Sequence, residues 1–295
     1  MWSLKGAKIQ ILKEPDIFFI FAFKDPGIMI STSQSKLIRS LQKKKYRQET
    51  QLFPVEGEKL VGELLQGDPA GRFHIRELFA SPEWIASHPS LQLHRAARIT
   101  EATPSDFRKI SNQVSPQPVL ALVSIPEEES SPEELLRKPV LAFESIRDPG
   151  NLGTILRTAD WFGIGQVVCS PDSTDMYNPK VVQSTMGAIF RVRVLYLDLE
   201  DLLKRGEMRT RSVVGTFLEG DNLYETMLDP DSFILFGNES HGLSGRLTPL
   251  IQKRISIPSF SGSEPGPESL NVAASVAVVC SELRRRPAGA TQSEN

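Results

Sequence analysis

The chain has 295 residues, of which 40% are hydrophobic, and a formal net charge of -2 at pH 7. These values fit a globular protein of up to two modest domains, and they exclude a general attraction to polyanions, so any nucleic-acid surface must be a local patch. The two cysteines, Cys169 and Cys280, form neither a disulfide framework nor a CxxC metal pair, which favours buried thiols in a reducing cytoplasm.

The N-terminal residues 1–30 are set apart as a leader. Residues 17–23, IFFIFAF, are strongly apolar but too short to span a bilayer, and no small-residue cleavage site follows them. Met29 then opens a more conventional sequence. We interpret residues 1–28 as an upstream extension from a wrongly assigned start codon, with a weakly anchored leader as the alternative.

Residues 31–126 alternate between helical and strand patterns. Leu37, Ile38 and Leu41 recur at helical spacing after Ser31. The later elements are a strand, turn and helix in 52–65, a strand in 74–81, a short helix in 98–111 and a strand in 116–126. This alternation predicts a small α/β domain.

Residues 127–138, EEESSPEELLRK, predict a linker whose acidic run is a solvated face. Beyond it, residues 139–286 predict a second α/β domain, followed by a disordered tail, 287–295. Six apolar strands are expected at 140–146, 166–170, 190–197, 212–219, 233–239 and 254–260, with helices that include 152–162 and 269–286. Apolar strands separated by helices indicate a mostly parallel sheet covered on both faces.

A glycine turn opens the first helix of this domain. The stretch DPGNLGTILRTADWFG (148–163) contains Gly150 and Gly153 but lacks the three glycines of a dinucleotide fold and the lysine of a P-loop. The four histidines show no metal-ligand spacing, so no metal is expected. Taken alone, Asn151 fits a capping amide and Arg157 a solvated helix arginine.

Two further stretches favour a functional role for this turn. In ILFGNESHGLS (234–244) a buried apolar strand runs into Gly237 and then Glu239. In 254–283 a strand ends at Ile257-Pro258, and Ser269-Leu270-Asn271 then opens a long helix. The carboxyl ends of parallel strands are where α/β sheets bind ligands. Three strand ends that carry Asn, Glu or Ser beside glycine therefore predict one shared pocket.

Together these stretches resemble the SpoU (TrmH-like) family of RNA ribose 2'-O-methyltransferases, of the SPOUT superfamily. The first motif is matched from Asn151 through Phe162-Gly163, the second by Gly237–Glu239 with Gly242-Leu243, and the third by Ile257-Pro258 and Ser269–Val272. Residues 31–126 resemble the family's L30e-like substrate-binding domain. One departure is the loop 259–268, which is longer than is usual in the family and could alter cofactor affinity.

The resemblance implies an α/β fold with a deep trefoil knot, S-adenosylmethionine as cofactor and methyl transfer to a 2'-hydroxyl of RNA, ribosomal RNA rather than transfer RNA. The implied catalytic residues are Asn151, Arg157, Glu239, Ser269 and Asn271. The implied cofactor-binding residues are Gly237, Ile257 and Leu270. Arg157 would bind the phosphate beside the target ribose, Asn151 would orient that arginine or the hydroxyl, and Glu239 would fix the arginine or the neighbouring backbone.

The resemblance also implies a homodimer in which one subunit contributes to the other's site. RNA contact is expected at a basic run without carboxylates: Lys36, Arg39, Lys43, Lys44, Lys45 and Arg47. The alternative function is a catalytically idle RNA-binding protein of the same fold. The intact motif residues count against it, whereas the lengthened loop 259–268 keeps it open.

Overall fold

The computed structural model of the chain describes residues 8–14, 17–23, 30–67, 71–127, 138–261 and 269–290. It divides into an N-terminal unit, residues 1–127 with 177–179, and a C-terminal unit, residues 128–176 with 180–295. Most of the predicted linker and residues 262–268 of the lengthened loop lie outside the described residues.

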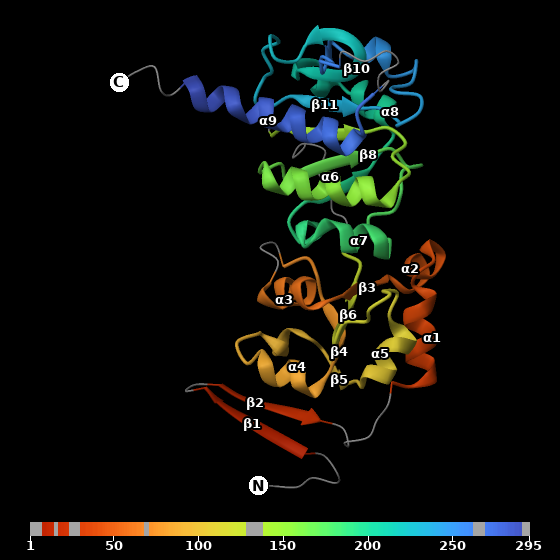
Figure 1. The fold of residues 1–295 in the computed structure, drawn as a ribbon, viewed down its shortest axis with the longest axis vertical. Helices are drawn as coiled ribbons and strands as arrows, with labels where there is room; N and C mark the ends of the chain where they lie inside the picture. The colour runs from red at the N-terminus through yellow and green to blue at the C-terminus, as the bar shows by residue number, and fades with distance from the viewer. Residues whose placement is uncertain are drawn as a thin grey trace. The chain divides into compact units, whose positions relative to one another are not determined.

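The N-terminal unit contains a hairpin and a four-stranded sheet (Figure 1). In the hairpin, β1 (Lys8–Glu14) pairs antiparallel with β2 (Ile17–Phe23). The sheet has the order β3-β6-β4-β5, with bounds Leu52–Glu56, Val119–Ser124, Ile75–Ala80 and Ile99–Glu101. Its β4–β5 pair is parallel and the others are antiparallel, so the unit is the small α/β domain that the pattern predicts.

Five α-helices are described in this unit: α1 (Thr32–Ser40), α2 (Lys44–Thr50), α3 (Glu58–Gln66), α4 (Pro82–Ser87) and α5 (Pro104–Ile110). A short 3-10 turn, η1, spans Leu93–Arg95. Ser31 and Thr103 start α1 and α5 with capping boxes. The basic run is not one helix, because the chain turns between Leu41 and Lys43 before α2 begins. After β4 the chain forms α4, which Ser81 caps.

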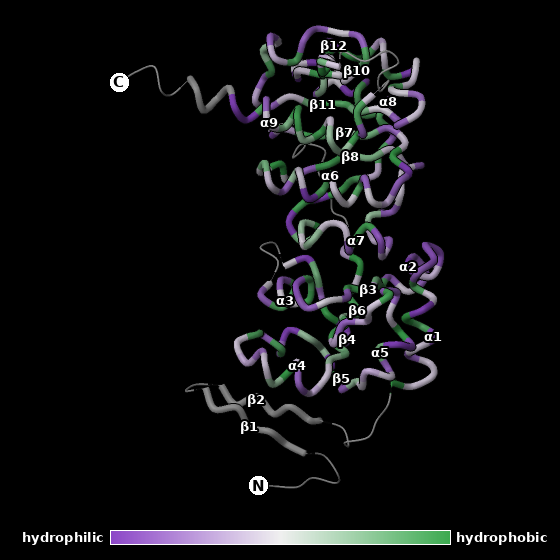
Figure 2. Tube along the Cα trace, viewed as in Figure 1, coloured by the Kyte–Doolittle hydropathy of each residue, from purple (hydrophilic) through white to green (hydrophobic). Residues whose placement is uncertain are grey.

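The C-terminal unit has a six-stranded parallel sheet of order β12-β10-β11-β7-β8-β9. In chain order the strands are β7 (Val140–Phe143), β8 (Gln166–Cys169), β9 (Arg193–Tyr196), β10 (Val213–Asn222), β11 (Phe233–Phe236) and β12 (Lys253–Ser256). All six predicted strands are present, and the sheet is wholly parallel. The central strands β7 and β11 are buried along their whole length, and Figure 2 shows that they are hydrophobic.

Helices pack on this sheet through its alternating side chains. Val140 and Ala142 of β7 share an apolar cluster with Leu202 of α8 (Leu199–Leu203). Because side chains alternate along a strand, Leu141 and Phe143 point to the opposite face. The helices α6 (Pro149–Trp161) and α9 (Val272–Ala290) pack side by side (Figure 1).

Short elements complete the unit: α7 (Pro179–Thr185, whose first residue belongs to the N-terminal unit) and the 3-10 turns η3 (Ala188–Phe190), η4 (Gly206–Thr210) and η5 (Thr248–Leu250). The final helix α9 continues to Ala290, beyond the predicted boundary at residue 286. Among the described residues, no helix has the length and apolar character needed to cross a membrane.

Candidate active site

The start of α6 carries the first group of site residues. Asp148 is the N-cap, and its Oδ1 accepts the amide of Asn151 at 2.8 Å, with Pro149 at the first helical position. Asn151 is therefore not the cap, contrary to the simple structural interpretation of the sequence. Its side-chain amide remains available to other segments.

Contacts within the protein explain the two glycines of this turn without a bound phosphate. At Gly153 a Cβ atom would lie 2.4 Å from Ser184 Cβ and 2.9 Å from the Val181 carbonyl oxygen, both on α7. Only glycine permits so close an approach of α6 and α7. Gly150 meets chiefly the Asp148 side chain, at 2.9 Å. Gly153 thus sets helix packing, and α6 supplies the polar groups.

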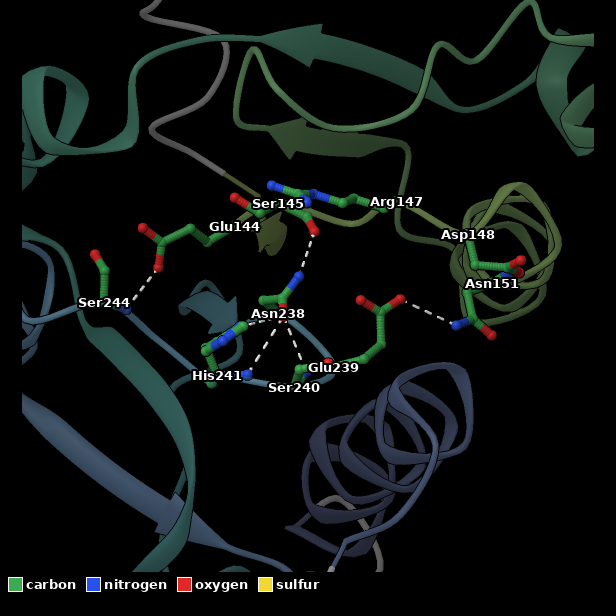
Figure 3. A pocket seen from close by; sticks show the side chains of 11 residues that line it. Glu144, Ser145, Arg147, Asp148, Asn151, Asn238, Glu239, Ser240, His241 and Ser244 are labelled. Carbon is green, nitrogen blue, oxygen red and sulfur yellow. Dashed lines mark hydrogen bonds between the residues drawn. The ribbon is translucent and has the colours of Figure 1, made fainter.

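Asn151 lies in the middle of a series of hydrogen bonds between three distant segments. Its Nδ2 donates to Glu239 Oε1 at 3.1 Å (Figure 3), and its Oδ1 accepts from Asn271 Nδ2 at 3.0 Å. Asn271 Oδ1 in turn accepts the amides of Ala273 and Ala274, at 2.9 and 3.4 Å, at the start of α9. The structure therefore brings together three of the five predicted catalytic residues.

The direction of this series is fixed by chemistry. Backbone amides only donate, so Asn271 must turn its carbonyl oxygen to α9 and its NH2 group to Asn151. Asn151 must then accept with its oxygen and donate to Glu239. The carboxylate of Glu239 is held through two amides from the positive end of a helix.

Glu239 lies in a tightly folded loop after β11. Asn238 and Gly242 exchange two backbone hydrogen bonds, of 3.0 and 2.9 Å. A Cβ atom at Gly237 would lie 2.1 Å from the carbonyl carbon of Gly242, so a side chain there would prevent the loop from closing. Glycine at this position is explained by loop closure, independently of any cofactor.

A cavity of about 510 Å³ lies between this loop and the segment that joins β7 to α6 (Figure 3). Its lining residues are Glu144, Ser145, Arg147, Asp148, Asn151, Asn238, Glu239, Ser240, His241, Gly242 and Ser244. Sequence reasoning identified Asn151 and Glu239 among them but missed Glu144, Arg147 and His241. Glu144 directly follows the buried strand β7, so the strand-end argument used for β11 would have found it.

Glu144 is only 6% exposed and holds the two strand ends together. Its Oε2 accepts the Ser244 amide at 2.7 Å, and its Oε1 lies 3.8 Å from Arg246. Arg246 also lies 3.7 Å from Glu200 of α8. The buried carboxylate is therefore paired both with a backbone amide and with a cation, as burial requires.

Ser145, the next residue, adopts a left-handed conformation with φ of 57°. Its amide donates to Ser170 Oγ at 2.7 Å, its hydroxyl donates to Asp172, and its carbonyl accepts Asn238 Nδ2 at 2.8 Å. These partners hold a conformation that is costly for a residue with a Cβ atom. Hydrogen bonds from Ser145 first and Ser170 second lower the pKa of Asp172.

Comparison with known proteins follows the same division of the chain. Residues 138–281 match the SpoU rRNA Methylase family, and residues 33–121 match the MRM3-like substrate binding domain. A TrmH-family protein of known structure from Porphyromonas gingivalis is 38% identical, with a TM-score of 0.77 over 88% of this chain and 100% of that one. This chain belongs to the SpoU family.

Other SpoU-related proteins carry more specific descriptions. The 23S rRNA (guanosine(2553)-2'-O)-methyltransferase RlmP of Bacillus subtilis is 29% identical over 83% of this chain and 94% of its own length. An AdoMet-bound rRNA methyltransferase structure from Sinorhizobium meliloti is 27% identical, with a TM-score of 0.73 over 88% of this chain and 97% of that one. The cofactor of the SpoU family is S-adenosylmethionine.

The residues present fit this cofactor. The cavity is lined by the carboxylates of Glu144, Asp148 and Glu239, which suit a positively charged sulfonium, and by one arginine, Arg147. The Ser244 hydroxyl is buried and has no hydrogen-bond partner among the described residues, so it can bond to a ligand. None of the predicted cofactor-binding residues lines this cavity: Gly237 and Ile257 follow β11 and β12, which flank β10 in the sheet. Leu270, 53% exposed, precedes α9.

The two remaining predicted catalytic residues stand apart from the Asn271–Asn151–Glu239 series. Arg157 is exposed on α6, and six helical residues rotate it by about 120° from Asn151. It shares its face with Thr154 and with Trp161, which is 84% exposed. Ser269 is exposed, and no hydrogen bond joins it to another described residue. Glu239 is thus held by Asn151 instead of Arg157.

The basic run of the N-terminal unit divides into two groups. The exposed side chains are Lys36, Arg39, Lys43, Lys44 and Lys45. Arg47 differs from the prediction: it is only 2% exposed, and its Nη1 donates to the carbonyls of Leu41 and Gln42 at 2.6 and 3.0 Å. The turn between α1 and α2 leaves these carbonyls without helical partners, and the buried guanidinium of Arg47 supplies their hydrogen bonds.

Proposed function

We propose that this chain transfers a methyl group from S-adenosylmethionine to a ribose 2'-hydroxyl of ribosomal RNA. Membership of the SpoU family and similarity to proteins named as rRNA 2'-O-methyltransferases support the proposal. The observation that carries it is the Asn271–Asn151–Glu239 series, because it joins three segments distant in sequence beside one cavity.

The bound cofactor supplies the methyl group. Backbone groups at Gly237, Ile257 and Leu270 hold it, within the trefoil knot that the resemblance implies. Asn151 and Glu239 orient the ribose hydroxyl, and Ser269 and Asn271 complete the hydrogen-bonding groups around it. Arg157 binds the neighbouring phosphate, for which its planar guanidinium is suited; its permanent charge makes it a poor base.

The N-terminal unit binds the RNA outside the target nucleotide. Its exposed cations, Lys36, Arg39 and the run Lys43–Lys45, provide the local positive surface that the net charge of -2 does not. Ribosomal RNA is favoured over transfer RNA as the substrate. We place the reaction in the cytoplasm, where the buried thiols of Cys169 and Cys280 stay reduced.

We further propose a homodimer in which Arg157 completes the site of the partner subunit. The exposure of Arg157 and Trp161 on one face of α6, away from Asn151, supports this arrangement. Mixing Asn151→Ala and Arg157→Ala subunits, each inactive alone, should restore about a quarter of the sites, since half the dimers are mixed and each has one intact site. An Arg157 that acts within its own subunit would restore none.

The alternative is a catalytically idle RNA-binding protein. Calorimetry with S-adenosylmethionine and transfer of a labelled methyl group to total RNA separate the two. Binding followed by labelling, lost in Asn151→Ala with the fold retained, supports the enzyme. A folded protein that binds RNA but neither binds cofactor nor transfers methyl would be the idle form. Mapping the ribose methylation lost in a deletion strain would identify the nucleotide.

A further inference from the structure

His241 lies in the loop that closes the cavity, and Asn238 fixes its orientation (Figure 3). The Nδ2 of Asn238 donates to the Ser145 carbonyl at 2.8 Å, so its Oδ1 must face the loop. There the oxygen accepts the Ser240 and His241 amides, at 2.9 and 3.3 Å. The same oxygen lies 3.3 Å from His241 Nδ1.

This contact determines the tautomer of the imidazole. An amide oxygen can only accept, so Nδ1 of His241 must carry hydrogen. In the neutral ring the lone pair then belongs to Nε2. His241 is exposed and lines the cavity, so a ligand there can reach its imidazole ring. A base oriented through its second nitrogen is the usual arrangement of a catalytic histidine.

The other ionisable groups that line the cavity are three carboxylates, each of which accepts a hydrogen bond, and one arginine. Glu144 accepts Ser244 and faces Arg246, Asp148 accepts Asn151 and lies 3.9 Å from Lys180, and Glu239 accepts the Asn151 amide. Arg147 is a cation with no lone pair to give. Imidazole is also the side chain whose ordinary titration lies nearest to neutral pH, which suits proton transfer under physiological conditions.

We propose that Nε2 of His241 accepts the proton of the ribose 2'-hydroxyl, an inference that rests on the proposed methyl transfer. The 2'-oxygen forms its new bond to the methyl carbon that the cofactor supplies, and the pair of the broken carbon–sulfur bond stays on sulfur. The O–H proton moves to the Nε2 lone pair, and the exposed imidazolium releases it to water. The carboxylates around the cavity stabilise this transient cation; they belong to Glu239, Asp148 and Glu144. Their charge offsets the repulsion that Arg147 and Arg246 exert on it.

The test is the pH dependence of single-turnover methylation at saturating RNA and cofactor, with S-adenosylmethionine binding followed separately by calorimetry. His241→Asn keeps a donor near Nδ1 and removes Nε2. It should lower the rate about 100-fold. It should also abolish the decline in rate at acid pH, with the Kd for cofactor and the KM for RNA within about twofold of the parent. Added imidazole should restore part of the rate to His241→Ala.

His88→Asn is the matched control, because His88 packs on Trp84 in the N-terminal unit and is outside the cavity. It should keep the parental rate and acid limb. A His241→Asn protein with the parental rate and acid limb, or one that loses cofactor binding instead of rate, would refute the role of His241. Either result would leave the methyltransferase activity of the parent intact, whereas a parent that transfers no methyl would refute the proposed function itself.

Discussion

In the N-terminal unit polar side chains tie a strand to its neighbours and close a turn, whereas in the C-terminal unit polar side chains tie strand ends together beside an open cavity. Glu77 accepts Thr100 Oγ1 at 2.7 Å and Gln34 Nε2 at 2.8 Å. Buried Arg47 similarly closes the turn after α1. The groups left for a partner are the exposed lysines and Arg39, which offer charge on flexible stems.

The C-terminal unit presents fixed geometry instead. Asn151 and Glu239 are held in one orientation by Asn271, and Asn238 is held by the strained turn at Ser145. Charge on flexible side chains raises affinity for RNA with little orientation, whereas a fixed series of donors raises the rate of one reaction. Substitutions in the two units should therefore change different measured quantities.

The largest effect is expected from Asn271→Asp. The carboxylate can still accept the amides at the start of α9, so the helix keeps its cap. It cannot donate to Asn151, which would then turn its amide and present an oxygen to Glu239. We expect kcat to fall about 100-fold with little change in melting temperature, measured by methyl transfer and circular dichroism.

Asn271→Ser is the companion variant, since serine also caps α9 but is too short to repel Asn151. It should lose less activity than Asn271→Asp. Equal activity of the aspartate variant and the parent would show that the direction of the hydrogen-bond series is irrelevant to catalysis.

Most of the fold follows from the sequence because its signals are local. The six strands of the C-terminal unit are short apolar runs that end at polar or glycine residues, and all six are present. The turn between α1 and α2 has no local signal, because Lys43 to Lys45 carry no breaker residue. It depends on Arg47, whose guanidinium is drawn inside by the carbonyls of the preceding helix.

The site was predictable only in part. Strand-end position predicted a shared pocket, and the family resemblance implied the roles of Asn151, Glu239 and Asn271. The role of Gly153 in helix packing and the place of His241 in the cavity depend on contacts between distant segments. The sequence could assign Arg157 to the same helix as Asn151, but the two residues face different directions around that helix.

Arg47→Met sharpens the contrast within the basic run. It removes two charge-assisted hydrogen bonds and leaves the carbonyls of Leu41 and Gln42 without their partner. The free energy of unfolding should fall by about 2 kcal/mol, measured by urea denaturation. Arg39→Gln, on an exposed residue of the same run, should leave stability unchanged. Weaker RNA binding in Arg47→Met at unchanged stability would contradict this structural role and show that Arg47 contacts RNA.

A triple variant of the exposed cations tests the other half of the contrast. Replacing Lys36, Arg39 and Lys43 by Gln should weaken RNA binding about tenfold at low salt and reduce the slope of log K against log salt by about 2. The rate at saturating RNA should be unchanged. Lys45→Gln should have a smaller effect, because Glu49 lies 3.8 Å from Lys45 and already offsets its charge. An unchanged salt slope in the triple variant would show that RNA binds to a different surface of the protein.

The smallest effect concerns the turn that fixes Asn238. The folded-state pKa of Asp172 is lowered by its hydrogen bonds from Ser145 and Ser170, so folding favours the ionised carboxylate. That stabilisation is complete above the unfolded value, near 3.8, and is lost as the pH falls through the lower folded value. Asp172→Asn should thus be slightly less stable than the parent at pH 7, and the difference should shrink below about pH 4, followed by urea midpoints. Ser145→Ala removes the main donor and should show the same convergence.

A constant difference at every pH would mean that the shape of the side chain, and not its charge, supports the turn. Cofactor affinity measured alongside would then show whether this turn acts on the cavity through Asn238, as the fixed geometry of the C-terminal unit requires.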